Sequence, residues 1–247
     1  MEQKLLRVVM ACLLLIAMAV VGRQTAAYVK TVHAVNALLT YAENKKMGEA
    51  CVVIDAGHGG DDPGKIGING AKEKDINLSV TEKLKSYLEA DGIRVVLTRD
   101  TKDGLYDANA SNKKVQDMKR RIEKIEKADP VLAVSIHQNS YPEEYVHGAQ
   151  VFYYTGSESG EALAAFLQNQ LRKTLDPDNN RQIKPNDSYY LLKKTKGTIV
   201  IVECGFLSNG EEAEKLCEEA YQDRVAWAIH KGILQYLYHQ ETTGKSK

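Results

Sequence analysis

Short apolar stretches alternate with amphipathic stretches along most of the chain, and this alternation constrains the fold more than any other feature. Apolar stretches such as Cys51–Asp55 and Val131–Ile136 are nearly continuous, which is typical of strands buried on both faces of a parallel sheet. The sequence therefore predicts a three-layer α/β domain, in which helices flank a mostly parallel, twisted sheet. The expected strands cover residues 51–55, 94–98, 131–136, 149–154, 189–193 and 198–203.

The stretches between these strands have helical periodicity. In residues 75–90 the apolar side chains fall on one helical face, and Gly92 follows as a stop signal. Ser111 is expected to cap the next helix, because its hydroxyl can accept a backbone N–H. A third helix is expected over residues 158–174. The last helix carries an apolar series with i, i+4 spacing: Val225, Ile229, Ile233 and Leu237.

Charge and cysteine content exclude several classes of protein. The 247-residue chain has 33 basic and 33 acidic side chains, so no net positive charge is present to hold a nucleic acid. Its 43% hydrophobic and 27% charged residues exclude intrinsic disorder. Cys12 lies in an apolar N-terminal segment, and the other three cysteines form no CxxC pair. This pattern excludes a zinc finger and a disulfide framework.

The N-terminus has the pattern of an export signal. Lys4 and Arg7 precede the apolar stretch Val8–Val21, as the charged and hydrophobic regions of a secretory signal do. We expect a hydrophobic helix over residues 1–22, either a cleaved signal peptide or a signal-anchor that attaches the protein to the membrane. The domain that follows is then expected to be exported. The other expected parts are a helical stalk (23–49), the folded domain (50–240) and a flexible tail (241–247).

Four side chains suited to metal binding or acid–base chemistry lie near strand and helix ends. His58 follows the first expected strand in a glycine-rich loop, and His137 and Glu203 end two later strands. Glu73 opens the first helix. In open α/β sheets the functional site lies at the carboxyl ends of the strands, so we expect these side chains at one edge. A buried, unpaired carboxylate is costly, so Glu203 needs a metal, a partner or a catalytic task.

This set of residue types indicates a zinc hydrolase. Two histidines and one carboxylate with an open fourth position form a recurring hydrolytic zinc site. A second carboxylate can act as general base on a water whose pKa the zinc lowers to about 7. The spacing between the four residues is non-local and gives only a weak signal, so the residue types alone leave the roles of Glu73 and Glu203 open.

Four sequence strings occur in the order typical of one enzyme family. They are Val53–Gly60, Glu73–Leu78, Ser135–Asn139 and Glu203–Asn209. Together they resemble the motifs of the zinc-dependent N-acetylmuramoyl-L-alanine amidase family, and the resemblance extends from about Cys51 to Tyr236. Lys65 and Cys204 depart from the family's usual pattern, and neither matches a ligand position.

The resemblance implies a single catalytic domain that cleaves the amide between the lactyl group of N-acetylmuramic acid and L-alanine in peptidoglycan. It implies His58, Glu73 and His137 as zinc ligands and Glu203 as the catalytic acid/base. The short, catalytic-only chain is most similar to the germination-specific, spore-cortex branch, in which the amidase prepares muramic δ-lactam formation. That branch implies a location on the outer face of the cytoplasmic membrane or in the intermembrane space of a forming spore. Whether the enzyme needs an accessory protein is left open by the sequence.

Three alternatives to the amidase remain at this stage. A zinc peptidase or deacetylase would use the same residues on another bond. A Cys–His wall peptidase would use Cys204 as its nucleophile, which requires a lowered thiol pKa. A membrane-tethered wall-binding module would keep no complete catalytic set. Among the other histidines, His147 could line the cleft, whereas His230 and His239 are expected to be solvated or packed.

Overall fold

The computed structural model describes residues 50–242. The hydrophobic helix expected over 1–22, the stalk over 23–49 and tail residues 243–247 lie outside this part of the chain. Within residues 50–242, no helix has the length and apolar character needed to span a membrane.

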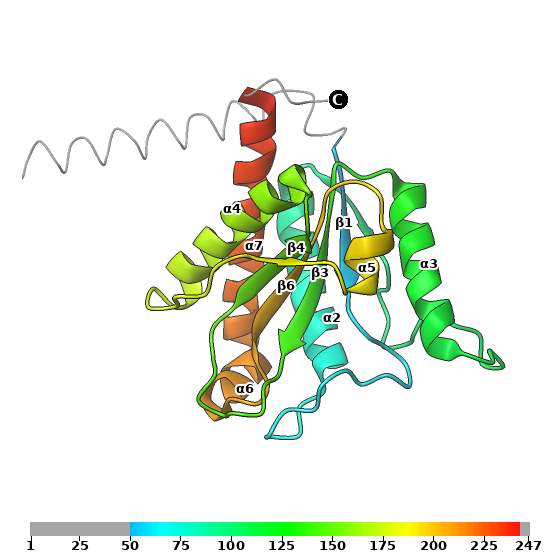
Figure 1. Cartoon of the computed structure of the whole chain (residues 1–247), viewed down its shortest axis with the longest axis vertical. Helices are drawn as coiled ribbons and strands as arrows, with labels where there is room; N and C mark the ends of the chain where they lie inside the picture. The colour runs from blue at the N-terminus through cyan, green and yellow to red at the C-terminus, as the bar shows by residue number, and fades with distance from the viewer. Residues whose placement is uncertain (1–49, 243–247) are drawn as a thin grey trace, which may run out of the picture. The chain divides into compact units, whose positions relative to one another are not determined.

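One sheet of six strands forms the centre of the domain, in the spatial order β2–β1–β3–β6–β4–β5 (Figure 1). Its strands are β1 (Cys51–Ala56), β2 (Arg94–Leu97), β3 (Leu132–Asn139), β4 (Gln150–Tyr154), β5 (Lys184–Asn186) and β6 (Ile199–Phe206). The strands β2, β1, β3 and β6 run parallel, whereas β4 pairs antiparallel with β6. A chain that leaves β3 and re-enters the sheet in the same direction needs a long crossover connection, which is usually a helix. The loop between β3 and β4 contains no helix, which agrees with the antiparallel direction of β4. The expected α/β sheet is confirmed, and it is mixed.

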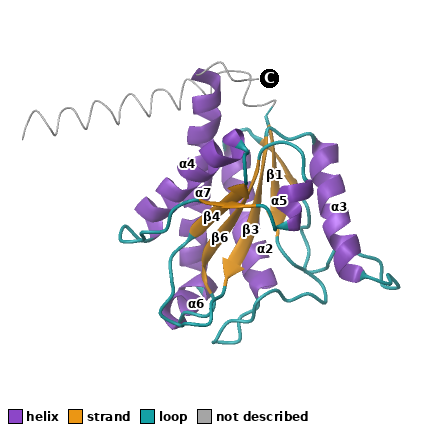
Figure 2. Ribbon diagram, in the orientation of Figure 1, coloured by secondary structure: helices purple, strands orange, loops and turns teal. Residues whose placement is uncertain are grey.

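Helices cover both faces of this sheet (Figure 2). They are α2 (Glu73–Ala90), α3 (Lys113–Ala128), α4 (Glu158–Leu175), α5 (Tyr190–Lys194), α6 (Gly210–Cys217) and α7 (Glu219–Thr242). One layer contains α2 and α4, with α7 packed against both. On the opposite face, α3 and α5 pack against each other and bury an apolar cluster that includes Val53, Ala133 and Ile201. The carboxyl ends of β1, β3 and β6 lie next to one another between these layers.

Two local predictions are wrong, both because contacts beyond the local sequence decide the outcome. Residues 189–193, expected as a strand, form most of the short helix α5, since Leu191 and Leu192 are both buried in the apolar cluster. Asn112, not Ser111, caps α3: its Oδ1 accepts the N–H of Val115 at 3.0 Å. Ser111 lies one residue farther from the first helical turn than this hydrogen bond requires.

A buried ionic network fixes the loop that follows β1. The Arg121 guanidinium, 1% exposed, donates to Asp55 Oδ1 at 2.7 Å, to Asp117 Oδ2 at 2.5 Å and to the carbonyl of His58. Arg99 donates to the carbonyls of Ala56 and Gly57 at 2.9 and 3.0 Å. Burial alone would raise the pKa of Asp55. The Arg121 charge and hydrogen bonds from two hydroxyls outweigh that effect and lower the pKa to about 2.

Replacing Arg121 should therefore be far more damaging than replacing its neighbour Arg120, whose ion pair with Asp107 is exposed. Arg121→Met is expected to lower the free energy of unfolding by about 3–5 kcal/mol, because it leaves the Asp55 carboxylate buried without a counter-charge. Arg120→Met should have little effect. Urea unfolding at neutral pH measures both variants. Equal stability of the two variants would contradict the structural role given to Arg121.

Candidate active site

The loop after β1 presents His58 in an unusual backbone conformation. His58 has a φ of 62°, in the left-handed region that a residue with a Cβ adopts at a cost. The arginine donors to the carbonyls of residues 56–58 hold this conformation. Next to it, Gly57 lets the His137 ring approach the loop, since a Cβ at this position would lie 2.3 Å from that ring. The loop thus places His58 against the end of β3.

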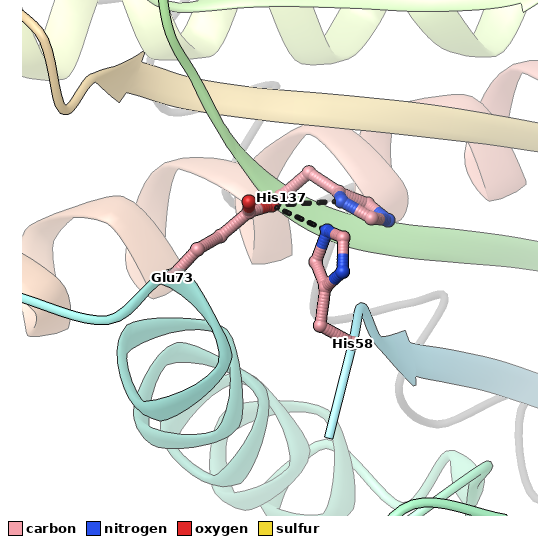
Figure 3. A group of neighbouring side chains, drawn as sticks. All are labelled: His58, Glu73 and His137. Carbon is pink, nitrogen blue, oxygen red and sulfur yellow. Dashed lines mark hydrogen bonds and ion pairs between the residues drawn. The ribbon is translucent and has the colours of Figure 1, made fainter. Parts of the chain in front are cut away.

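Three side chains from separate elements converge at this edge of the sheet (Figure 3). Glu73 Oε1, at the first turn of α2, lies 2.9 Å from His137 Nδ1 and 3.2 Å from His58 Nε2. One ligand-type atom from each residue lies within 4.8 Å of the other two. Two imidazole nitrogens and a carboxylate oxygen form the donor set of hydrolytic zinc sites. The group His58, Glu73 and His137 could therefore hold a metal ion.

Neighbouring groups orient these three side chains. Asp62 Oδ2 lies 3.0 Å from His58 Nδ1, an arrangement that fixes the ring of a metal-binding histidine. Glu73 Oε2 accepts the backbone N–H of Lys65 at 2.7 Å, and Oε1 accepts that of Gln138 at 3.1 Å. Burial would raise the pKa of Glu73, but hydrogen bonds and charge from the two histidines hold it well below its usual range. The carboxylate is thus ionised, as a ligand must be.

Glu203 lies beside this group on the neighbouring strand. It pairs in register with His137 across β3 and β6, and it is 7% exposed. Its Oε2 has no hydrogen-bond partner within residues 50–242. Burial, the largest effect, raises the pKa of the carboxyl to about 7. Buried polar atoms are normally paired, so this oxygen points to a group that binds in the site.

A cavity of about 930 Å³ contains all four residues. Several other side chains that were not predicted as site residues also line it; they are Asp62, Lys65, Tyr106, Tyr189 and Tyr190. For the three tyrosines, the large number of tyrosines in the sequence was the only hint.

Two alternatives for other side chains lose support. His147, which was considered as a cleft residue, is exposed and is not part of this cavity. Cys204 is fully buried, and burial raises the pKa of its thiol. A nucleophilic cysteine needs the opposite shift.

The family comparison decides which kind of hydrolase this is. A family model described as N-acetylmuramoyl-L-alanine amidase matches residues 52–235. The chain belongs to this amidase family. The resemblance found in the sequence motifs is confirmed.

Individual relatives agree with the family match. The germination-specific N-acetylmuramoyl-L-alanine amidase of Bacillus subtilis (strain 168) is 36% identical over 189 residues, which cover 75% of this chain and 79% of that protein. The CwlD amidase from Clostridioides difficile, solved in complex with the GerS lipoprotein, matches with a TM-score of 0.74 and 39% identity over 76% of this chain and 98% of that one. The amidase AmiC2 of Nostoc punctiforme matches with a TM-score of 0.67 and 34% identity, over 76% and 97% of the two chains.

Membership of the family establishes the class of reaction. This amidase is an enzyme that hydrolyses peptidoglycan, and its role is extracytoplasmic and associated with the cell wall. The wall-binding module without activity and the other wall hydrolases are therefore set aside.

Proposed function

We propose that this amidase is zinc-dependent and hydrolyses the amide between the lactyl group of N-acetylmuramic acid and L-alanine. The observation that carries the proposal is the convergence of His58 Nε2, Glu73 Oε1 and His137 Nδ1 at one point of the cavity. These three residues are the proposed ligands. Zinc, when bound, supplies Lewis acidity toward a carbonyl oxygen and makes water nucleophilic near neutral pH.

Glu203 is the proposed acid/base. Its unpaired Oε2 can accept the proton of the attacking water as the new C–O bond forms, and it can then donate that proton to the L-alanine nitrogen as the C–N bond breaks. An amine leaves poorly without a proton, so one carboxyl group that serves both steps suits an amide substrate. The proposed role of Asp62 is to hold the His58 ring in place through His58 Nδ1.

We further propose that the substrate is spore cortex and that the product leads to muramic δ-lactam. The identity and coverage of the germination-specific relative support this assignment. An accessory lipoprotein partner is part of the same proposal, because the CwlD neighbour was solved with one.

Export through the N-terminal segment completes the proposal. Its parts are a signal peptide or signal-anchor at 1–22, a stalk at 23–49, the catalytic domain at 50–240 and a tail at 241–247, whose first two residues continue α7. Lys4, Arg7 and the apolar stretch Val8–Val21 support it. The working location is the outer face of the cytoplasmic membrane or the intermembrane space of the forming spore. Fractionation of cells that express the chain without residues 1–21 should find it in the cytosol. Export of that truncated chain would refute this part.

Mass spectrometry of cell-wall fragments tests the activity and its setting. The zinc-loaded protein should release peptides that begin with L-alanine and leave the glycan strand intact, and a chelator should stop the release. Cortex from a spore former that lacks its own enzyme should regain muramic δ-lactam when this chain is expressed. Peptide release without δ-lactam recovery would retain the amidase and exclude the cortex role. Cleavage within the peptide would exclude the amidase assignment.

A further inference from the structure

The two halves of the proposed substrate differ in charge. The glycan half is neutral and rich in hydroxyl groups, whereas the peptide that leaves with L-alanine carries free carboxylates. The cavity itself contains the carboxyl groups of Asp61, Asp62, Glu73 and Glu203. A peptide carboxylate that lies among these groups, away from the proposed zinc, needs a basic side chain beside it. The cations of the cavity therefore indicate where the peptide binds.

Two of the four lysine and arginine side chains that line the cavity are already paired with carboxylates. Lys113 Nζ lies 2.7 Å from Asp61 Oδ2, and the Arg121 guanidinium is held by Asp55 and Asp117. Lys65 and Lys114 also line the cavity, and both are exposed. Neither takes part in an ion pair within the described residues. These two lysines are the candidates for contact with a substrate carboxylate.

The backbone of Lys65 is tied to the proposed metal site. Its N–H donates to Glu73 Oε2 at 2.7 Å, and its carbonyl accepts the N–H of Glu73 at 2.9 Å. Glu73 in turn contacts His137, which pairs with Glu203 across the sheet. Lys65 therefore keeps a fixed position relative to the reacting groups, and its side chain remains free to reach a ligand.

The two lysines lie at different parts of the cavity. The loop that carries Lys65 meets the end of β6, the strand of Glu203, where the N–H of Ile68 donates to the carbonyl of Leu207 at 3.0 Å. Lys114 lies on α3, next to Lys113, which pairs with Asp61. Glu203 must lie next to the L-alanine nitrogen to protonate it, so the leaving peptide extends from the Glu203 side of the cavity. Lys65 lies on that side.

We propose that Lys65 forms a carboxylate-binding subsite for the leaving peptide, at the α-carboxylate of the residue that follows L-alanine. The inference rests on the proposed amidase function and adds how the substrate is oriented. In this arrangement the peptide lies on the Lys65 side of the cavity. Selectivity for an acidic stem peptide then comes from Lys65, which is not one of the proposed metal ligands.

Two matched substrates test this subsite with the zinc-loaded protein. One is a glycan strand whose stem carries D-glutamate after L-alanine, and the other is the same strand with that α-carboxylate amidated. For Lys65→Met, kcat/KM on the acidic substrate should fall about threefold to tenfold, mainly through KM, as expected for one partly exposed charge pair. On the amidated substrate the change should be small, and Lys65→Arg should retain selectivity. High salt should reduce the preference of the unmodified protein for the acidic strand.

Lys114→Met is the matched control, since it removes another unpaired lysine of the same cavity. It should change kcat/KM by the same factor on both substrates. Equal losses on both substrates for Lys65→Met would show that Lys65 acts through Glu203 or through folding, and would overturn the subsite. The subsite would also be overturned if Lys114→Met, and not Lys65→Met, lost kcat/KM selectively on the acidic substrate. Failure of the unmodified protein to cleave either strand would instead refute the proposed function.

Discussion

Glu203→Gln is expected to retain its fold and its metal while kcat falls by about 10²–10⁴-fold, the usual contribution of general acid–base catalysis. The amide side chain has nearly the same shape, but it can neither accept the proton of water nor deliver one to the leaving nitrogen. Because burial disfavours the Glu203 carboxylate, a neutral side chain should be tolerated at this position. Metal analysis, thermal unfolding and peptide release on one preparation give the three readouts.

Each outcome for Glu203→Gln has a distinct meaning. Full activity would remove Glu203 from the mechanism. A protein that folds and lacks metal would show that Glu203 is a ligand, and that the roles of the two glutamates are exchanged. Loss of activity with full metal content is the result that the unpaired Oε2 supports.

Removal of a proposed ligand should abolish both tight zinc binding and activity. His137→Ala and His58→Ala each leave two protein ligands, and Glu73→Gln replaces the ionised oxygen that both histidines contact with a neutral one. We expect zinc content near one ion per chain in the unmodified protein, and a loss of zinc after dialysis in each variant. Elemental analysis beside the peptide-release assay measures both quantities.

His147→Ala is the control for the ligand variants, since His147 is exposed and lies outside the cavity. It should retain zinc and activity. Unchanged zinc content in His58→Ala and His137→Ala would show that the ligand set is wrong. Unchanged zinc in Glu73→Gln alone would mean that the two imidazoles and a further group hold the ion.

Supporting residues should determine how firmly the site is held. The loop that carries His58 depends on Arg99 and Arg121, which donate to three successive backbone carbonyls. The left-handed backbone of His58 persists because these buried donors offset its cost. The stability of the domain and the geometry of the site therefore depend on the same buried arginines.

Local sequence patterns were sufficient for much of the fold and for the proposed site residues. Continuous apolar stretches predicted β1, β3 and β6, and the helical spacing in residues 75–90 predicted α2. Since the carboxyl ends of parallel strands share an edge, the sequence also placed His58, His137 and Glu203 together. The family motifs distinguished the proposed ligand Glu73 from the proposed acid/base Glu203, which spacing alone left open.

Tertiary structure decided the features that depend on residues far apart in the chain. The antiparallel direction of β4 follows from its pairing with β6, and the helical form of α5 follows from burial of Leu191 and Leu192. Arg121 reaches Asp55 across the fold, and the Lys65 backbone reaches Glu73 around a turn. Hydrophobic periodicity reports which face of an element is buried, but not which distant group it meets. The shape of the cavity and the lysines left unpaired in it were therefore visible only in the folded chain.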